Sequence, residues 1–215
     1  MGSSRLPGKV LKPIAGKALL DHVLGRIELL QYPCEVIVAT SYLPMDNDIE
    51  QHCIANEVAV FRGSESDVLD RYYQCASEKK FNHVVRLTAD NPFTDVEELQ
   101  RLIELHLSEE NDYSHSFDTM PLGVGAEIFS FEGLEKSAKN GNQPNHREHV
   151  NEYIHEYHEN FKIGTLTVAP IKHCPNLRLT VDTIEDYERA CTIASRAPSR
   201  WIWTEEAIRI CLHSA

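Results

Sequence analysis

The sequence predicts an α/β fold, with an open, mainly parallel sheet that is covered by helices on both faces. Short apolar runs rich in β-branched residues, such as Glu35–Thr40 and His83–Leu87, alternate with segments of helical spacing, such as Leu20–Ile27. Such runs are typical of strands buried on both faces, and their alternation with helices favours parallel strands. Hydrophobic residues make up 42% of the 215 residues, which is enough for a hydrophobic core.

The first half of the chain is expected to alternate regularly between helices and strands. Apolar residues at spacings of three and four mark the helices, and two of the helices begin at capping pairs. In chain order, the expected elements are helix Leu20–Ile27, strand Glu35–Thr40, helix Asp46–Asn56, strand Val58–Phe61, a helix from Ser64 with Asp67 through Ala76, strand His83–Leu87, and a helix from Thr94 with Glu97 through Ile103.

The second half is less regular. Three segments have the apolar or alternating pattern of strands: Ala126–Phe131, Lys162–Val168 and Leu177–Val181. A helix is expected after the capping pair Thr183 and Asp186, and a last amphipathic helix over Thr204–Leu212. No internal repeat or linker separates the halves, so residues 1–215 are predicted to form a single domain.

Composition excludes several classes of protein. A net charge of −12 lacks the positive footprint of nucleic-acid binding, and no apolar run has the roughly 18–20 residues of a membrane span. The six cysteines form no Cys-x-x-Cys pair, so we expect free, mostly buried thiols in a reducing cytoplasm. Four basic residues nevertheless precede the first acid: Arg5, Lys9, Lys12 and Lys17. This island favours a compact anion such as a nucleoside triphosphate.

The stretch Ser3-Ser4-Arg5-Leu6-Pro7-Gly8-Lys9 is the most specific motif in the chain. It brings hydroxyls, a guanidinium and an ammonium together, as phosphate binding requires. It is not a P-loop, because Val10 follows Lys9 at the position where that motif needs Ser or Thr. The alternative interpretation is a solvated N-terminus without a ligand.

Asp90 and Asp182 each come just after an expected strand. Open α/β sheets bind ligands at the carboxyl ends of their strands, and carboxylates at that edge can hold Mg²⁺. Taken singly, Asp90 could start an Asx turn and Asp182 could face a helix dipole. Together with the cationic loop, the two residues predict metal-assisted handling of a nucleoside triphosphate.

A histidine-rich segment over residues 146–158 lacks the spacing of a metal-binding motif, since it contains only one Glu-x-x-His pair. One solvated helical face is expected to carry Glu148, Glu152 and His155. Arg147 and His149, at the expected helix start, are candidates for binding an anionic or hydroxylated substrate.

Several motifs together resemble a known family: Met1-Gly-Ser-Ser-Arg-Leu-Pro-Gly-Lys9, Phe61-Arg-Gly-Ser64, Asp67-Val-Leu-Asp-Arg-Tyr72, Arg147-Glu-His-Val150 and Leu179-Thr-Val-Asp-Thr183. The chain resembles the spore coat polysaccharide biosynthesis protein F group, which belongs with the KDO and acylneuraminate cytidylyltransferases. The resemblance covers essentially the whole chain. It implies a GT-A-like fold, as in nucleotide-diphospho-sugar transferases. It also implies nucleotide transfer, typically of CMP from CTP, to a sugar or sugar acid for surface glycans.

The resemblance further implies roles for single residues. The implied nucleotide-binding residues are Ser3, Ser4, Arg5, Gly8 and Lys9; the implied catalytic residues are Lys9, Arg5 and Asp90; the implied Mg²⁺ ligands are Asp90 and Asp182; the implied substrate-binding residues are Glu127, Arg147, Glu148 and His149. The sugar hydroxyl is expected to attack the α-phosphate and expel pyrophosphate. A cytoplasmic enzyme is implied that needs no nucleic acid or membrane and that forms a homodimer.

Two departures from the family pattern affect what we expect. Family members begin with a hydrophobic strand before the Met1-Gly-Ser-Ser loop, so the first strand is expected to be missing, through a late start codon or a natural chain that extends upstream. Family members usually have the stretch Pro-x-Gly-Leu-Asp-x-Glu, which contains two acids. The corresponding segment of this chain, Pro121–Glu127, keeps only the second acid, Glu127. Two alternatives stay open. One is a glycosyltransferase, because Asp46-Asn-Asp48 has the sequence of the Asp-x-Asp motif of such enzymes, and the other is a non-catalytic truncated homologue.

Overall fold

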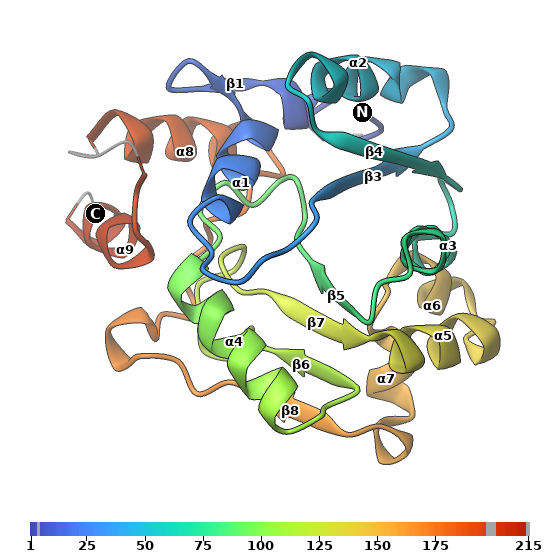
Figure 1. The fold of residues 1–215 in the computed structure, drawn as a ribbon. Helices are drawn as coiled ribbons and strands as arrows, with labels where there is room; N and C mark the ends of the chain where they lie inside the picture. The colour runs from blue at the N-terminus through green and yellow to red at the C-terminus, as the bar shows by residue number, and fades with distance from the viewer. Residues whose placement is uncertain (4, 197–200, 214–215) are drawn as a thin grey trace.

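The computed structural model of the protein describes residues 1–3, 5–196 and 201–213 (Figure 1). The α-helices are α1 (Leu19–Ile27), α2 (Asn47–Ala55), α3 (Val68–Lys79), α4 (Val96–Ser108), α5 (Phe131–Asn140), α6 (Pro144–Glu148), α7 (Glu152–Glu156), α8 (Ile184–Arg196) and α9 (Thr204–Leu212). The strands are β1 (Pro13–Ile14), β2 (Lys17–Ala18), β3 (Ile37–Ser41), β4 (Ala59–Gly63), β5 (His83–Arg86), β6 (Tyr113–His115), β7 (Glu127–Ser130) and β8 (Ile163–Thr165). Short 3-10 helices are η1 (Lys9–Leu11), η2 (Pro44–Asp46), η3 (His158–Asn160) and η4 (Pro170–Lys172).

The described strands form three separate sheets. β1 and β2 pair in a short antiparallel ribbon, and β3 pairs with β4 in parallel, with Val38 opposite Val60. The third sheet has the order β5-β7-β6-β8, in which β7 runs antiparallel to both of its neighbours. The α/β fold is confirmed, but the expectation of a mainly parallel sheet is wrong. The chain passes from β6 to β7 through a loop without a helix, and such a connection reverses the strand direction.

Helices cover both faces of the sheets, as the sequence predicts (Figure 1). α1 and α2 pack together with β3 and β4 through Leu20, Ile49 and Cys53. α3 contacts the same two strands and places Leu69 in a second cluster, which it shares with α5, α7, β6 and β7. A third cluster lies among α4, α8, α9 and the loops that follow β5 and β6. The buried apolar residues are therefore divided into three clusters.

Most expected elements lie where the sequence places them, and α9 has the expected bounds. The prediction of a strand over Leu177–Val181 is wrong. Its N–H groups donate to loop carbonyls instead of to a neighbouring strand, and its one β-bridge joins Arg178 to Leu122. The side chain that caps α4 belongs to Asp95, which accepts from the Glu98 N–H, and not to Thr94.

The structure also corrects the expectations for the middle of the chain. Residues 146–158 do not form one helical face, because α6 and α7 are separate helices and Glu148 ends the first of them. β6 and α5 were not expected. β6 was missed because its polar residues Ser114 and His115 are buried, and polar residues are unusual in such a strand.

All six cysteines are free, as expected, although only Cys53 and Cys75 are buried. Among the described residues, no helix has the length and apolar character needed to cross a bilayer.

His106 on α4 makes stability depend on pH. Its side chain is fully buried, and its ring nitrogens contact the Ser114 hydroxyl at 2.9 Å and the His83 ring at 3.1 Å. Burial, with the nearby His83, lowers the pKa of His106 to about 4. The unfolded chain binds this proton at a pKa of about 6.5. The contribution of His106 to stability is therefore complete above pH 6.5 and is lost progressively as the pH drops toward 4.

We expect the free energy of unfolding to fall by about 2 kcal/mol between pH 7 and pH 5 because of His106. Urea titrations at both pH values measure the difference. The variant His106→Gln should lose this part of the pH dependence even if it is less stable overall. An unchanged dependence in the variant would contradict the assignment to His106.

Candidate active site

Three segments that are distant in the sequence meet at the ammonium group of Lys9. Its Nζ donates to Asp90 Oδ2 at 2.7 Å, to Asp182 Oδ1 at 2.8 Å and to the carbonyl of Val181 at 2.9 Å. Gly8, just before Lys9, has a φ of 69°, in the left-handed region that favours glycine. The turn at Gly8 starts η1, the short helix that begins with Lys9.

Loops at the ends of two segments position the carboxylates. Asp90 follows β5 in a turn that the Asn91 N–H closes by donating to the Thr88 carbonyl at 3.1 Å. The Val181 N–H donates to the Asp90 carbonyl at 2.9 Å, so the backbone links the two acidic segments directly. Asp182 therefore lies beside Asp90 although the expected strand before it is absent.

The start of α8 holds Asp182 in place. Asp186 accepts from the N–H groups of Asp182 and Thr183 at 3.0 and 3.1 Å, and Thr183 Oγ1 accepts from the Asp186 N–H at 3.3 Å. The expected capping pair is confirmed, and its Asp186 also fixes the backbone of Asp182. Arg178 bonds to both carboxylates, Asp182 and Asp186.

The environment of Asp182 favours its ionised form. Burial opposes its charge, but the hydrogen bond and charge of Lys9, together with the charge of Arg178, lower the pKa of the Asp182 carboxyl below its ordinary value. A carboxylate that stays ionised can bind a cation across the physiological pH range.

The other predicted residues of the N-terminal loop lie near Lys9, with differing contacts. Arg5 approaches Asp182 Oδ1 at 3.5 Å, and its side chain is 64% exposed. Ser3 Oγ accepts from the Leu6 N–H at 3.2 Å, which closes the loop. Ser4 lies outside the described residues.

A pocket of about 250 Å³ opens beside the two carboxylates, and we call it the carboxylate pocket. It is lined by Arg86, Leu87, Thr88, Asp90, Asn91, Phe117, Leu122, Gly123, Gly125, Glu127, Thr180 and Asp182. Gly123, with a φ of 96°, lies so close to Thr180 that a Cβ atom would be 2.5 Å from its backbone nitrogen. A Cβ at Gly125 would lie 2.9 Å from the Phe117 ring.

A buried polar network forms one wall of the carboxylate pocket. Glu127 has no exposed surface, and its carboxylate accepts from Arg86 and, at 2.7 Å, from the Tyr113 hydroxyl. Asn151 donates to the same hydroxyl at 3.3 Å. Burial opposes the Arg86 charge, but the charge of Glu127 raises the pKa of the guanidinium. Burial and Glu127 raise the pKa of the Tyr113 hydroxyl, so it stays a donor.

The structure does not place Arg147, Glu148 and His149 in this pocket. Arg147 donates to the Ala138 carbonyl at 3.0 Å and lies 3.5 Å from the Asp67 carboxylate, so it joins α6 to α5 and α3. Glu148 and His149 are exposed, and neither lines the carboxylate pocket. Of the four predicted substrate-binding residues, only Glu127 borders it.

The donor set could hold one divalent cation through two carboxylates. Asp90 and Asp182 both place an oxygen within 2.8 Å of one cationic nitrogen, that of Lys9. In the part of the chain that the structure describes, no group of three or more His, Cys, Asp and Glu side chains could hold a metal ion.

The Asp46-Asn-Asp48 motif lies elsewhere. Asp46 is buried and accepts from Thr40, Ser41 and the Met1 amine, and Asp48 is exposed on α2. Burial opposes ionisation of Asp46, but these donors lower its pKa to about 2. Protein groups already bind the Asp46 carboxylate. This favours a structural role for the Asp46-Asn-Asp48 motif over the role that it would have in a glycosyltransferase.

Several residues of the site were missed from the sequence. Arg178 could have been found, because it lies four residues before Asp182 and i,i+4 spacing often joins opposite charges. Asp186 was predicted only as a capping residue of the helix that follows. Local patterns could not predict the network of Arg86, Tyr113 and Asn151, because its members are brought together only by the pairing of β5, β6 and β7.

Comparisons with known proteins place this geometry in context. The chain matches a family model described as Cytidylyltransferase over residues 1–208. It is 35% identical to the spore coat polysaccharide biosynthesis protein SpsF of Bacillus subtilis (strain 168), over 93% of this chain and 85% of that protein. It is 31% identical to the 8-amino-3,8-dideoxy-manno-octulosonate cytidylyltransferase of Shewanella halifaxensis (strain HAW-EB4), over 57% of this chain and 49% of that protein. The solved structure of a cytidylyltransferase from Leptospira borgpetersenii serovar Hardjo-bovis (strain JB197) matches with a TM-score of 0.92 and 32% identity, covering 100% of this chain and 91% of that chain.

Proposed function

Because the chain belongs to the cytidylyltransferase family, we propose that it transfers CMP from CTP to a sugar acid and releases pyrophosphate, for the synthesis of a surface polysaccharide. The observation that carries this proposal is the convergence of Lys9, Asp90 and Asp182 at one point beside a pocket. Those residues come from the beginning, middle and end of the chain. We therefore propose residues 1–215 as one catalytic unit. A homodimer stays a prediction.

Lys9 and Arg5 are the proposed triphosphate ligands. The Lys9 side chain is only 12% exposed, so its charge is weakly screened and acts strongly on a nearby phosphate. The exposed guanidinium of Arg5 can reach phosphate oxygens from solvent and bind two of them at once. In the free protein the two aspartates neutralise these cations and hold them in place.

Asp90 and Asp182 fit Mg²⁺ as a partner of the nucleotide. Mg²⁺ prefers oxygen ligands and is commonly bound by one or two carboxylates together with substrate phosphates. Bound there, the ion would neutralise phosphate charge and, as a Lewis acid, polarise a phosphoryl oxygen, which would make the phosphorus more electrophilic. Lys9 lies against the same carboxylates and can donate to the phosphate oxygens from that position.

The carboxylate pocket is the proposed place of the sugar acid. A hydroxyl of the sugar would attack the α-phosphorus, forming an oxygen–phosphorus bond as the bond to pyrophosphate breaks, while the hydroxyl proton passes to solvent. Asn91 Oδ1 is buried, has no hydrogen-bond partner among the described residues, and belongs to a residue that lines the pocket. It can accept from a sugar hydroxyl, since a buried acceptor gains by pairing.

Pyrophosphate release tests the proposal. The folded protein, checked by circular dichroism, is incubated with Mg²⁺, one of the four nucleoside triphosphates and octulosonate-type sugar acids. We expect release with CTP, and a loss of roughly 100-fold or more in Asp90→Asn and Asp182→Asn. The matched control is Asp48→Asn, an exposed aspartate that should keep full activity. Loss of activity in Asp48→Asn, or no release with any triphosphate, would contradict the proposal.

A further inference from the structure

The two carboxylates of the proposed cation site are carried by different pieces of backbone. Asp186 fixes the backbone of Asp182 by accepting from its N–H at 3.0 Å. Asp90 lies in a turn over residues 88–94, between β5 and α4, which we call the Asp90 turn. Because Mg²⁺ demands near-ideal octahedral geometry, the Asp90 turn must be held as firmly as the backbone of Asp182.

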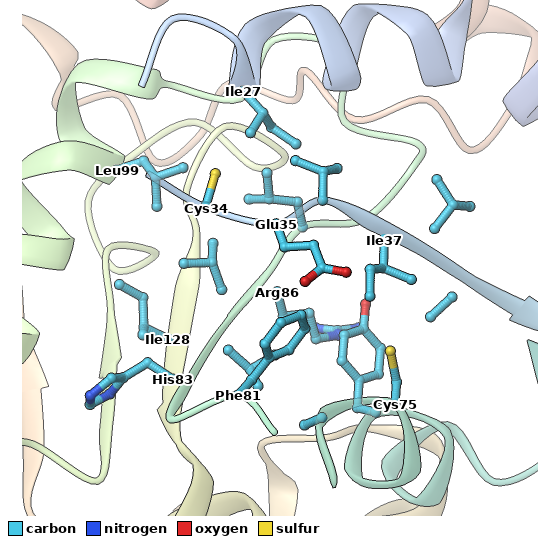
Figure 2. A pocket seen from close by; sticks show the side chains of 18 of the residues that line it. Ile27, Cys34, Glu35, Ile37, Cys75, Phe81, His83, Arg86, Leu99 and Ile128 are labelled. Carbon is cyan, nitrogen blue, oxygen red and sulfur yellow. The ribbon is translucent and has the colours of Figure 1, made fainter. Parts of the chain in front are cut away.

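Apolar packing does not surround the chain that leads to Asp90. The segment Leu87–Ala89 lines a cavity of about 590 Å³ between β3 and β5, and most of the other lining residues are apolar. Figure 2 shows Ile27 of α1 and Leu99 of α4 in the wall of this cavity. Polar contacts therefore have a large share in holding the Asp90 turn in place.

Arg26, near the end of α1, supplies such contacts from inside the protein. Its side chain is only 2% exposed. Its Nε donates to the Pro92 carbonyl at 2.7 Å, and its Nη1 donates to the Thr94 carbonyl at 3.3 Å. The guanidinium also lies 6.0 Å from the centre of the Phe93 ring. One buried cation therefore contacts three consecutive residues of the Asp90 turn.

Hydrogen bonds within the Asp90 turn connect these contacts to Asp90. The N–H and the hydroxyl of Thr94 both donate to the Asn91 carbonyl, at 3.4 and 3.0 Å, and the Asn91 N–H donates to the Thr88 carbonyl at 3.1 Å. On the other side, the Val181 N–H holds the carbonyl of Asp90 at 2.9 Å. Asp90 is thus fixed between Val181 and the contacts of the buried cation.

The charge of Arg26 makes its anchoring strict. Its Nη2 donates to the carbonyl of Ile202, so the three hydrogen bonds described for this guanidinium all go to backbone carbonyls. Burial lowers the pKa of Arg26 to about 10, against the charge of Asp95, and the side chain therefore stays charged at neutral pH. A buried charge is costly unless its donors are paired, and the donors of a guanidinium form a rigid fork. Displacing the carbonyls would leave those donors unpaired.

We propose that Arg26 is a positioning residue for the cation site. By fixing the carbonyls on either side of Phe93, it holds the carboxylate of Asp90 where it can share one cation with Asp182. This inference rests on the proposed function, which places the cation between these two carboxylates. Groups that orient metal ligands from behind change metal affinity by roughly 10- to 100-fold when they are replaced.

Hydrogen exchange in the free protein tests the effect of Arg26 on the Asp90 turn. Arg26→Lys keeps the charge but carries its donors on one nitrogen, so it cannot bind both carbonyls of the turn as the guanidinium does. We expect exchange of the Asn91 and Val181 amides to become roughly 10-fold faster, while the amides of β7 keep their rates. This measurement needs neither CTP nor metal.

Mn²⁺ titration of the free protein, followed by electron paramagnetic resonance, tests the effect on the cation site. The binding that is lost in Asp90→Asn defines the site. We expect Arg26→Lys to weaken this binding by roughly 10-fold, measured well below the Tm of the variant. A purely structural role of Arg26 would lower Tm and leave the Mn²⁺ affinity of the folded protein unchanged.

Arg62→Lys is the matched control. Arg62 also donates to backbone carbonyls, those of Ser41 at 2.5 Å and Leu43 at 3.0 Å, but it lies beside η2 and not at the Asp90 turn. Its replacement should leave Mn²⁺ affinity and Asn91 exchange unchanged. If Arg26→Lys does not fold, Arg26→Gln takes its place, because it keeps a donor without a buried charge.

The outcomes separate this inference from the proposed function. Unchanged Mn²⁺ affinity and unchanged Asn91 exchange in the folded Arg26 variant would overturn the role of Arg26. Equal effects in the Arg62 variant would overturn it as well. If Asp90→Asn itself bound Mn²⁺ like the original chain, the proposed function would instead lose its cation site.

Discussion

Replacing Lys9 with methionine is expected to lower kcat for pyrophosphate release by roughly 100- to 1,000-fold, the usual cost of losing one charge-stabilising donor. Methionine keeps most of the length of the side chain but removes the ammonium that contacts both carboxylates. The phosphate charge that develops as pyrophosphate leaves would then lose its nearest protein cation. Initial rates at saturating CTP and sugar acid measure the effect.

Lys12→Met is the matched control for this prediction. Lys12 belongs to the same basic island, but its ammonium lies 5.5 Å from the Tyr187 ring centre instead of at the carboxylates. Its replacement should leave kcat within about twofold of the original. If Lys12→Met were as impaired as Lys9→Met, a general effect of positive charge would explain both, and the geometry around Lys9 would not.

Replacing Glu127 with alanine is expected to destabilise the protein by about 3–5 kcal/mol, because it leaves the Arg86 guanidinium without its buried partner. Glu127 has no exposed surface, and it also accepts from Tyr113. For a chain of this length, such a loss lowers Tm by roughly 10 °C. Calorimetry or urea unfolding checks the prediction.

A double variant without charges separates the ion pair from the packing. The variant Arg86→Met with Glu127→Leu removes both charges and keeps apolar volume, so it should be much more stable than Glu127→Ala alone. If the double variant were as unstable as the single one, loss of packing and not an unpaired charge would be the cause. Glu127 was predicted from the resemblance to bind substrate, and its burial favours a supporting role in the wall of the pocket.

How well the sequence predicts each feature depends on the range of the interactions that form it. The capping pair of Thr183 and Asp186 and the bounds of α9 were readable because those features involve residues within one or two helical turns. The motifs with Lys9, Asp90 and Asp182 were also visible. The conformation of Leu177–Val181 could not be predicted, since an alternating pattern does not say whether a partner strand is available.

By itself, the sequence determined the α/β class, the family and the three residues at which a nucleotide site was to be sought. Only the tertiary structure decided that Lys9 lies between two carboxylates 81 and 173 residues further along the chain. It also decided that Arg147 and His149 lie outside the carboxylate pocket, and that β3 and β5 leave a cavity between them. Local patterns report the conformation of near neighbours, whereas contacts over such separations arise only when the whole chain packs.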